Sequence, residues 1–199
     1  RGPDGIKILL DIMSRPNVEF IIGNHELMMI DAIMSLKDNP RETFGSWMYN
    51  WYSEGGQKTH AKFKRLRAKK RESVLRFLLN APYSAYKTVN GRSFYIVHGG
   101  PKHAADPEVL TYFSTDKYTM AWCRPNVNTY IPMVGVDYVV FGHTPTYYYQ
   151  GVIDGHLRIF KGTGNASQLI GIDCACGSTK SYGRLACLRL DDFEEFYVD

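Results

Sequence analysis

The chain has 199 residues, of which 44% are hydrophobic and 22% charged, with a formal net charge of +4. This size suits one well-buried core, so we expect a single domain spanning residues 1–199. No apolar run approaches the roughly 20 residues that cross a bilayer, which predicts that a membrane is not a partner. Four cysteines are too few for a disulfide scaffold, so we expect them to be reduced and mostly buried, in a cytoplasmic protein.

The start of the chain predicts two helices that flank a buried strand. Apolar residues recur at helical spacing over residues 4–14, and Arg15-Pro16-Asn17 ends that helix. The apolar run at residues 18–22 predicts a strand in the core. A second helix is expected over residues 26–36.

The middle of the chain predicts a helical cap over the site, from about residue 41 to residue 80. Aromatic residues at 44–52 lead through Gly55-Gly56 into a basic stretch, 58–76, with nine Lys or Arg against one acid, Glu72. Such a stretch attracts anions, but no aromatic residues alternate with its charges as they do in nucleic-acid readers. We therefore expect one solvated amphipathic helix there, and favour that over a nucleic-acid partner.

Short strands dominate the rest of the chain. We expect them at residues 85–89, 94–97, 138–141, 147–153, 157–160, 169–173, 185–190 and 195–198. Asn90-Gly91 and Asp154-Gly155 have the composition of hairpin turns, and Cys174-Ala175-Cys176 would place two thiols on one face of a strand. Helices first and hairpins later predict an α/β fold, with two packed mixed β-sheets flanked by helices.

Three polar strings stand directly after strand-like runs. Gly23-Asn24-His25-Glu26 follows Ile22, His98-Gly99-Gly100 follows Val97, and Gly142-His143-Thr144 follows Phe141. In open α/β sheets, ligands bind where the strands end, so Asn24, His98 and His143 are expected to gather at one edge. An amide oxygen and two imidazoles suit Mn²⁺, Fe²⁺ or Zn²⁺ better than Ca²⁺.

A single histidine of this kind is more often a core residue satisfied by hydrogen bonds. The three strings together weigh against that interpretation, because Gly-Asn-His-Glu alone arises by chance on the order of once in a thousand chains of this length.

The order Arg1-Gly2-Pro3-Asp4, Gly23-Asn24-His25-Glu26, His98-Gly99-Gly100, Gly142-His143-Thr144 resembles the calcineurin-like metallophosphoesterases. The similarity is to the branch of PPP-type serine/threonine phosphatases and symmetrical diadenosine tetraphosphatases. It implies a phosphatase with two divalent metals, Mn²⁺ foremost, that acts on a phosphorylated protein or a small phosphoester.

The resemblance also implies roles for particular residues. Asn24, His98 and His143 would hold one metal, and His25 would donate a proton to the leaving alkoxide. Arg1 and Arg124 would grip the phosphate, since guanidinium forks suit phosphoryl oxygens.

This sequence also departs from the family. It has no match to two family motifs, Gly-Asp-x-His-Gly and Gly-Asp-x-x-Asp-Arg-Gly. In the family, these motifs supply the first metal's ligands and the bridging aspartate. We therefore expect a sandwich that lacks its first β-α-β portion, truncated at the N-terminus, and a chain that is inactive as it stands. Two segments differ from the eukaryotic forms of the family: Ile21-Ile22 before the Gly-Asn-His-Glu string, and Cys174-Ala175-Cys176 near the C-terminus. These differences predict a bacterial or phage-like protein.

Three alternatives stay open at this point. The first is a diadenosine tetraphosphatase-like hydrolase, in which Trp47 or Trp51 of the cap stacks on a base. The second is an incomplete fragment that acts as a binding module. The third is nucleic-acid binding through the basic stretch, which would show as an affinity that falls steeply with salt.

Overall fold

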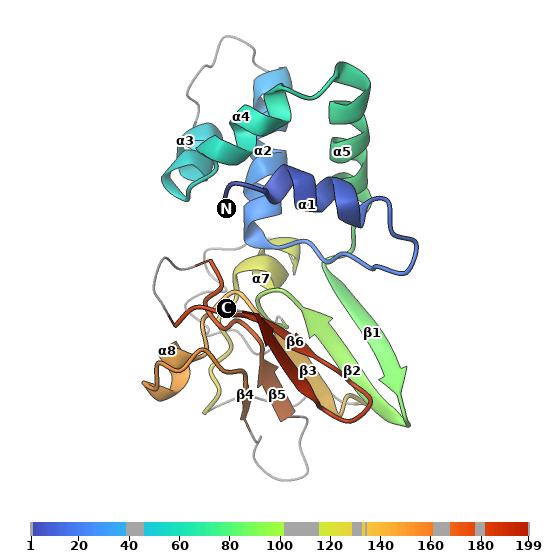
Figure 1. Cartoon of the computed structure of the whole chain (residues 1–199), viewed down its shortest axis with the longest axis vertical. Helices are drawn as coiled ribbons and strands as arrows, with labels where there is room; N and C mark the ends of the chain where they lie inside the picture. Colours follow the sequence, from blue (N-terminus) through green and yellow to red (C-terminus); the bar gives the residue numbers. More distant parts are fainter. Residues whose placement is uncertain are drawn as a thin grey trace. The chain divides into compact units, whose positions relative to one another are not determined.

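The computed structural model describes residues 2–38, 46–101, 116–128, 133, 135–160, 168–177 and 182–198. In these ranges the protein is mixed α/β, with seven helices, a five-stranded mixed sheet and a two-stranded sheet (Figure 1). It divides into two compact units, residues 1–82 and 83–199, which are described separately because their relative positions are not determined. Among the described residues, no helix has both the length and the apolar stretch that spanning a bilayer requires.

The first unit is helical. Its helices are α1 (Gly5–Ile12), α2 (Asn24–Asp38), α3 (Ser46–Ser53), α4 (Gln57–Lys64) and α5 (Ala68–Asn80). The central helix is α2, which contacts both α3 and α5, while α1 contacts α4. Leu27, Ala32 and Ile33 of α2 are buried, so the helix is fixed mainly by packing. The expected cap is therefore helical where it is described, and its place over the site stays a prediction.

Two expectations for this unit are wrong. Residues 18–22 form no strand; the one backbone hydrogen bond described for Ile22 as a donor runs to the Pro82 carbonyl, at 2.9 Å. An apolar run becomes a strand only where a neighbouring strand completes the ladder. The basic stretch 58–76 is also not one helix, because α4 ends at Lys64 and Arg67 is extended, with φ −60° and ψ 149°.

The second unit is built on the five-stranded sheet, in the order β1-β2-β3-β5-β4. Its strands are β1 (Ser84–Val89), β2 (Arg92–Val97), β3 (Tyr138–Phe141), β4 (Arg158–Phe160) and β5 (Gln168–Gly171). The three central strands, β2, β3 and β5, are parallel, and β1 and β4 are antiparallel to their neighbours. The Asn90-Gly91 turn is confirmed, since both residues have the positive φ of a tight hairpin turn (50° and 75°).

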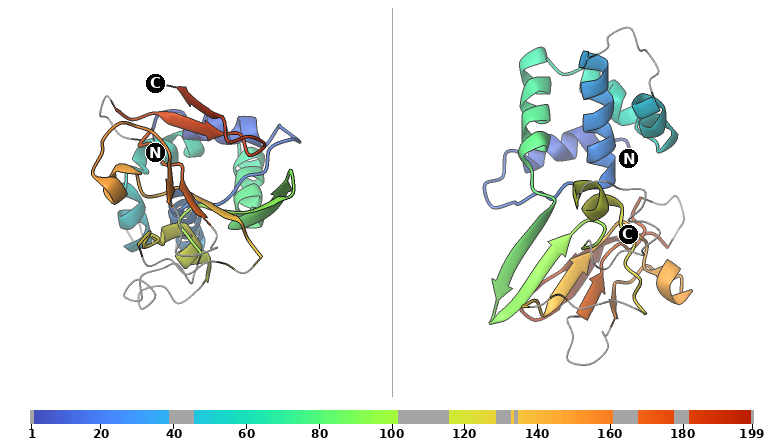
Figure 2. Two further views of the ribbon diagram at one scale, coloured as in Figure 1. Left: turned by 90° about the horizontal axis from the view of Figure 1, so that it is seen from below. Right: turned by 180° about the vertical axis from the view of Figure 1, so that it is seen from behind.

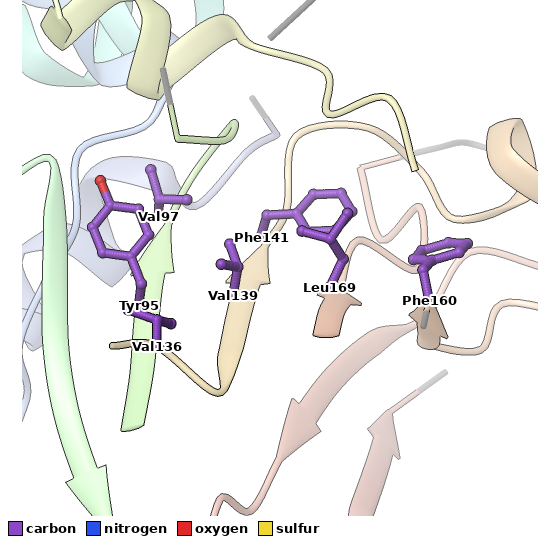
Figure 3. Packing of buried hydrophobic residues seen from close by; sticks show 7 residues of the cluster. All are labelled: Tyr95, Val97, Val136, Val139, Phe141, Phe160 and Leu169. Carbon is purple, nitrogen blue, oxygen red and sulfur yellow. The ribbon is translucent and has the colours of Figure 1, made fainter. Parts of the chain in front are cut away.

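Both faces of this sheet are buried. Figure 3 shows one face, where Tyr95, Val97, Val139, Phe141 and Leu169 pack together with Phe160 and Val136. On the other face lie Phe94, Val140 and Ile170. Strand residues that alternate between two apolar layers are typical of a central parallel sheet.

The two-stranded sheet pairs β6 (Leu185–Leu188) with β7 (Glu195–Val198) and lies across one face of the larger sheet (Figure 2). Tyr197 and Leu188 pack against the Phe94 layer. Two sheets are therefore present, as expected, and helices α7 (Asp116–Trp122) and α8 (Tyr147–Gln150) accompany them. The specific metallophosphoesterase sandwich and its missing first portion stay predictions.

Three expectations for the second unit are wrong. Residues 147–153 contain helix α8 instead of a strand, and Gly151, at φ 69°, ends it. Asp154-Gly155 is not a hairpin turn: helix α8 precedes it, and the strand after it, β4, pairs with β5. Two of the four cysteines are exposed, and Cys174 is buried while Cys176 is exposed, because Ala175 has φ 62° and breaks the strand alternation.

Candidate metal centre

Two of the predicted metal ligands, His98 and His143, lie side by side. They follow β2 and β3, which are adjacent parallel strands with Val97 opposite Phe141. The Gly142 amide donates to the His98 carbonyl at 2.8 Å, and the two imidazole centroids are 5.3 Å apart at an interplanar angle of 60°. The strand-end rule accounts for their adjacency, and their role as metal ligands stays a prediction.

The backbone at His143 is held in an uncommon conformation. Its φ is 64°, in the left-handed region that non-glycine residues seldom occupy. The Thr144 amide closes the turn on the Gly142 carbonyl at 2.6 Å, and the Trp122 ring meets the imidazole edge-on at 5.7 Å. Nε2 of His143 is buried. Strain of this kind is retained mostly where it aims a side chain for function.

Burial determines the charge of His98. Desolvation lowers its pKa from 6.5 to about 4, because a positive imidazolium is costly where water is excluded. His98 is therefore neutral near pH 7. A neutral imidazole keeps the nitrogen lone pair that a metal ion needs.

The glycines after His98 allow a close backbone approach. A Cβ on Gly99 would lie 2.8 Å from the Cys123 amide nitrogen, and one on Gly100 would lie 2.7 Å from Pro125 Cγ. The Gly99 amide also donates to the Met120 carbonyl at 2.6 Å. The histidine loop thus packs directly on the end of α7.

Arg124 lies in the segment that packs on this loop, between Cys123 and Pro125, and its side chain is exposed. Its charge helps to offset the desolvation that raises the pKa of Tyr149 to about 12. Arg124 therefore belongs to the same neighbourhood as the two histidines. Arg1, the second predicted phosphate-binding arginine, lies outside the described residues.

Asp173 is a polar residue at the end of a third strand that the sequence reasoning did not single out. It follows β5, the parallel neighbour of β3. Its carbonyl accepts from the Thr146 amide and its Oδ1 from the Ala175 amide, both at 2.9 Å. Asp173 thereby ties the loop after His143 to the end of β5. The strand-end rule would have found it, had it been applied to the run that ends at Ile172.

Asn24 and His25 belong to the first unit, at the start of α2. Asn24 is buried, and the Gly23 amide donates to Oε2 of Glu26 at 3.1 Å, which caps the helix in the manner of a capping box. Burial raises the pKa of Glu26, although the Gly23 hydrogen bond opposes that shift. His25 and Glu26 line a cavity of about 160 Å³ together with apolar residues that include Met29.

The convergence of Asn24 with His98 and His143 stays a prediction, since the three residues belong to two units. Within the described ranges, no group of three or more His, Cys, Asp or Glu side chains is arranged to hold a metal ion. Two neutral imidazoles fit part of the coordination shell of a borderline divalent ion, and the expected amide oxygen of Asn24 would have to add to them. No protein-family model matches the chain, and no curated protein matches it.

Proposed function

We propose that this chain is part of a metal-dependent phosphoester hydrolase of the calcineurin-like type. The observation that carries the proposal is the His98–His143 pair, with imidazole centroids 5.3 Å apart at the ends of adjacent parallel strands. His143 has a left-handed backbone, and burial keeps the His98 imidazole neutral near pH 7. A metal-binding pair makes use of both.

Asn24, His98 and His143 are the residues that would hold a divalent ion, with Mn²⁺ as our first choice. Such an ion, paired with a second one, supplies a Lewis acid and an acidified water for in-line attack at phosphorus. His25 donates the proton that the leaving alkoxide takes up. Arg124 and Arg1 orient the phosphoryl oxygens through guanidinium hydrogen bonds. Hydrolysis of a phosphorylated protein or small phosphomonoester follows.

A second candidate substrate is a dinucleoside polyphosphate. Tyr147 and Tyr148 stack on each other at 4.7 Å in the helix that follows the His143 loop, and Tyr148 is 64% exposed. Exposed aromatic rings near a phosphate site favour substrates with a planar base. Trp51 does not fit the stacking role expected for it, because it is only 2% exposed; Trp47, at 44%, is accessible.

Metal titration tests the proposal directly. Calorimetric titration of the protein with Mn²⁺ should show binding that falls at least about tenfold in His98→Ala and His143→Ala, since even outer-shell changes cost 10–100-fold. His156→Gln, a histidine of the same unit outside this strand edge, is the matched control and should bind as the parent does. Equal affinity in all four proteins would refute the metal centre.

Turnover tests the reaction. The 199 residues contain no match to the motifs that supply the bridging aspartate, so by themselves they should hydrolyse p-nitrophenyl phosphate slowly or not at all with Mn²⁺. A version that also carries those motifs should hydrolyse it, and should lose that activity on His98→Ala. Equal rates for both versions would show that the first metal's ligands are dispensable, and our mechanism would be wrong.

A further inference from the structure

A dense cluster of positive charge lies where α4 turns into α5. It consists of Lys64, Arg65, Arg67, Lys69, Lys70 and Arg71, which we call the basic corner. The first five are exposed and Arg71 is partly buried. No acidic residue stands between Lys64 and Arg71.

The broken helix changes what these charges do. In one continuous amphipathic helix they would be spread along a solvated face, as the sequence predicted. Instead, α4 ends at Lys64 and α5 begins at Ala68, so the six charges surround a three-residue connection. The apolar residues on either side of it, Phe63 and Val74, are buried. The basic corner therefore concentrates its charge at one place on the first unit.

Arg71 holds the corner in shape. Its Nη1 donates to the Leu66 carbonyl at 2.6 Å and to the Lys64 carbonyl at 3.3 Å. These bonds supply a donor to the last carbonyl of α4, that of Lys64, and to the Leu66 carbonyl in the connection. The exposed cations around the turn are thus presented on a fixed backbone, which reduces the entropy lost on binding a partner.

The corner's charge is not balanced from within. Two acids near these helices are engaged elsewhere, Asp4 by Lys62 at 3.4 Å and Glu72 by Arg76 at 2.9 Å. Within the described part of the chain, none of the five exposed cations forms a salt bridge. Lys69 and Lys70 also occupy the first turn of α5, where positive charge opposes the helix dipole. Such an arrangement costs stability and is relieved by an anionic partner.

The surroundings of the corner decide which polyanion fits best. An anionic lipid surface attracts such charges and holds them more firmly where apolar side chains beside them insert, but here Phe63 is buried and the exposed neighbours are Ala61 and Ala68. An acidic peptide uses pockets for its side chains, and the two described pockets of this unit are lined by other residues. A nucleic-acid backbone needs only closely spaced cations.

We propose that the basic corner binds the phosphate backbone of nucleic acid, without preference for sequence. The sequence weighed against nucleic-acid binding here because no aromatic residues alternate with the charges, but binding to phosphates alone does not require such residues. This inference is independent of the proposed hydrolase activity. It rests only on charges and contacts of the first unit.

Fluorescence anisotropy with a labelled 20-base-pair duplex, in EDTA and over a range of NaCl concentrations, tests it. The triple variant Arg65→Gln, Lys69→Gln, Lys70→Gln should lower the magnitude of the slope of log K against log salt by about 2 to 3, because each phosphate contact contributes ~0.9. At low salt its affinity should fall about tenfold or more. The control variant Lys7→Gln, Lys87→Gln, Lys117→Gln removes three exposed cations outside the corner and should change both values little.

Each other outcome counts against the proposal. A salt-independent parent affinity, or equal losses in the two triple variants, would overturn it. So would tighter binding to polyglutamate or to phosphatidylserine vesicles than to the duplex, which would assign the corner to an acidic protein or to a lipid surface. Circular dichroism checks the fold, and the double variant Arg65→Gln, Lys70→Gln should give an intermediate slope if the triple variant is destabilised.

Discussion

The two units hold their candidate site residues in different ways. In the second unit, His98 and His143 extend from paired strands, and the Gly142 amide links their loops through the His98 carbonyl at 2.8 Å. In the first unit, Asn24 and His25 begin a helix that follows an irregular segment. There one local restraint is the side chain of Glu26, which accepts from the Gly23 amide.

This difference determines how much local change the candidate residues of each unit tolerate. A strand end fixed by sheet pairing and by backbone packed on backbone has no room to adjust, because protein interiors are close-packed. At a helix start, loss of a side-chain cap typically costs only about 1 kcal/mol. Substitutions in the His98 loop should therefore have larger effects than substitutions at the start of α2.

The largest effect is expected for Gly99→Ala. Its Cβ would meet the backbone nitrogen and oxygen of Cys123 at 2.8 and 2.9 Å, and backbone atoms cannot rotate away as a side chain can. Overpacking of this kind should lower the free energy of unfolding of the second unit by about 3 kcal/mol. Urea unfolding measures the loss. Gly177→Ala is the matched control, since its Cβ would meet nothing within 4 Å, and a loss of equal size there would contradict the argument.

The next effect concerns the protonation of His98. Its pKa is about 4 in the folded protein and 6.5 without the fold, so the unfolded chain binds more protons between these values. Stability is therefore lost as the pH falls from about 6.5 to about 4, by about 2 kcal/mol, given that one pKa unit corresponds to 1.36 kcal/mol and that partial exposure reduces the effect. His98→Gln should remove this part of the pH dependence.

Urea unfolding in EDTA at pH 7, 5.5 and 4 provides the measurement. The curves of the parent and His98→Gln should diverge as the pH falls, with the variant losing less stability. Parallel curves would mean that His98 is as well solvated in the folded protein as in the unfolded chain.

The sequence predicted the second unit better than the first. Strands β1, β2, β3 and β5 coincide with apolar runs that are bounded by turn residues. Each of these runs has another strand beside it, so the local pattern predicted a strand correctly. The run at 18–22 has the same local pattern, but in the described residues it has no strand beside it. Local pattern alone cannot tell these cases apart, because the ladder depends on residues far along the chain.

The tyrosine-rich segment failed for a different reason. Tyr147, Tyr148 and Tyr149 favour strands by propensity, which predicted a strand, but Pro145 precedes the segment and Gly151 ends it as a left-handed cap. Those flanking residues are helix signals, and they were the better guide here. The candidate site residues differ in the same way. His98 and His143 follow strands that formed as predicted. Asn24 was expected to follow a strand as well, but it begins a helix after a segment that forms no strand.

The smallest effect is expected at Glu26, and it has the opposite sign to most core changes. Burial raises the pKa of its carboxyl above 4.5, so the folded protein holds the proton more tightly than the unfolded chain. The stability that this proton brings is present below pH 4.5 and is lost as the pH rises through the folded pKa. Glu26→Gln keeps an oxygen for the Gly23 amide but carries no charge. At pH 7 the variant should therefore protect the α2 amides from hydrogen exchange more than the parent does. Near pH 4 the two proteins should be equally protected.

The control is Glu54→Gln, which changes an exposed carboxylate of the same unit and should change protection little at either pH. A loss of protection in Glu26→Gln at pH 7 would show that the negative charge itself, acting on the positive end of the α2 dipole, outweighs its desolvation, and the start of α2 would then be held by electrostatics as firmly as His98 is held by the sheet.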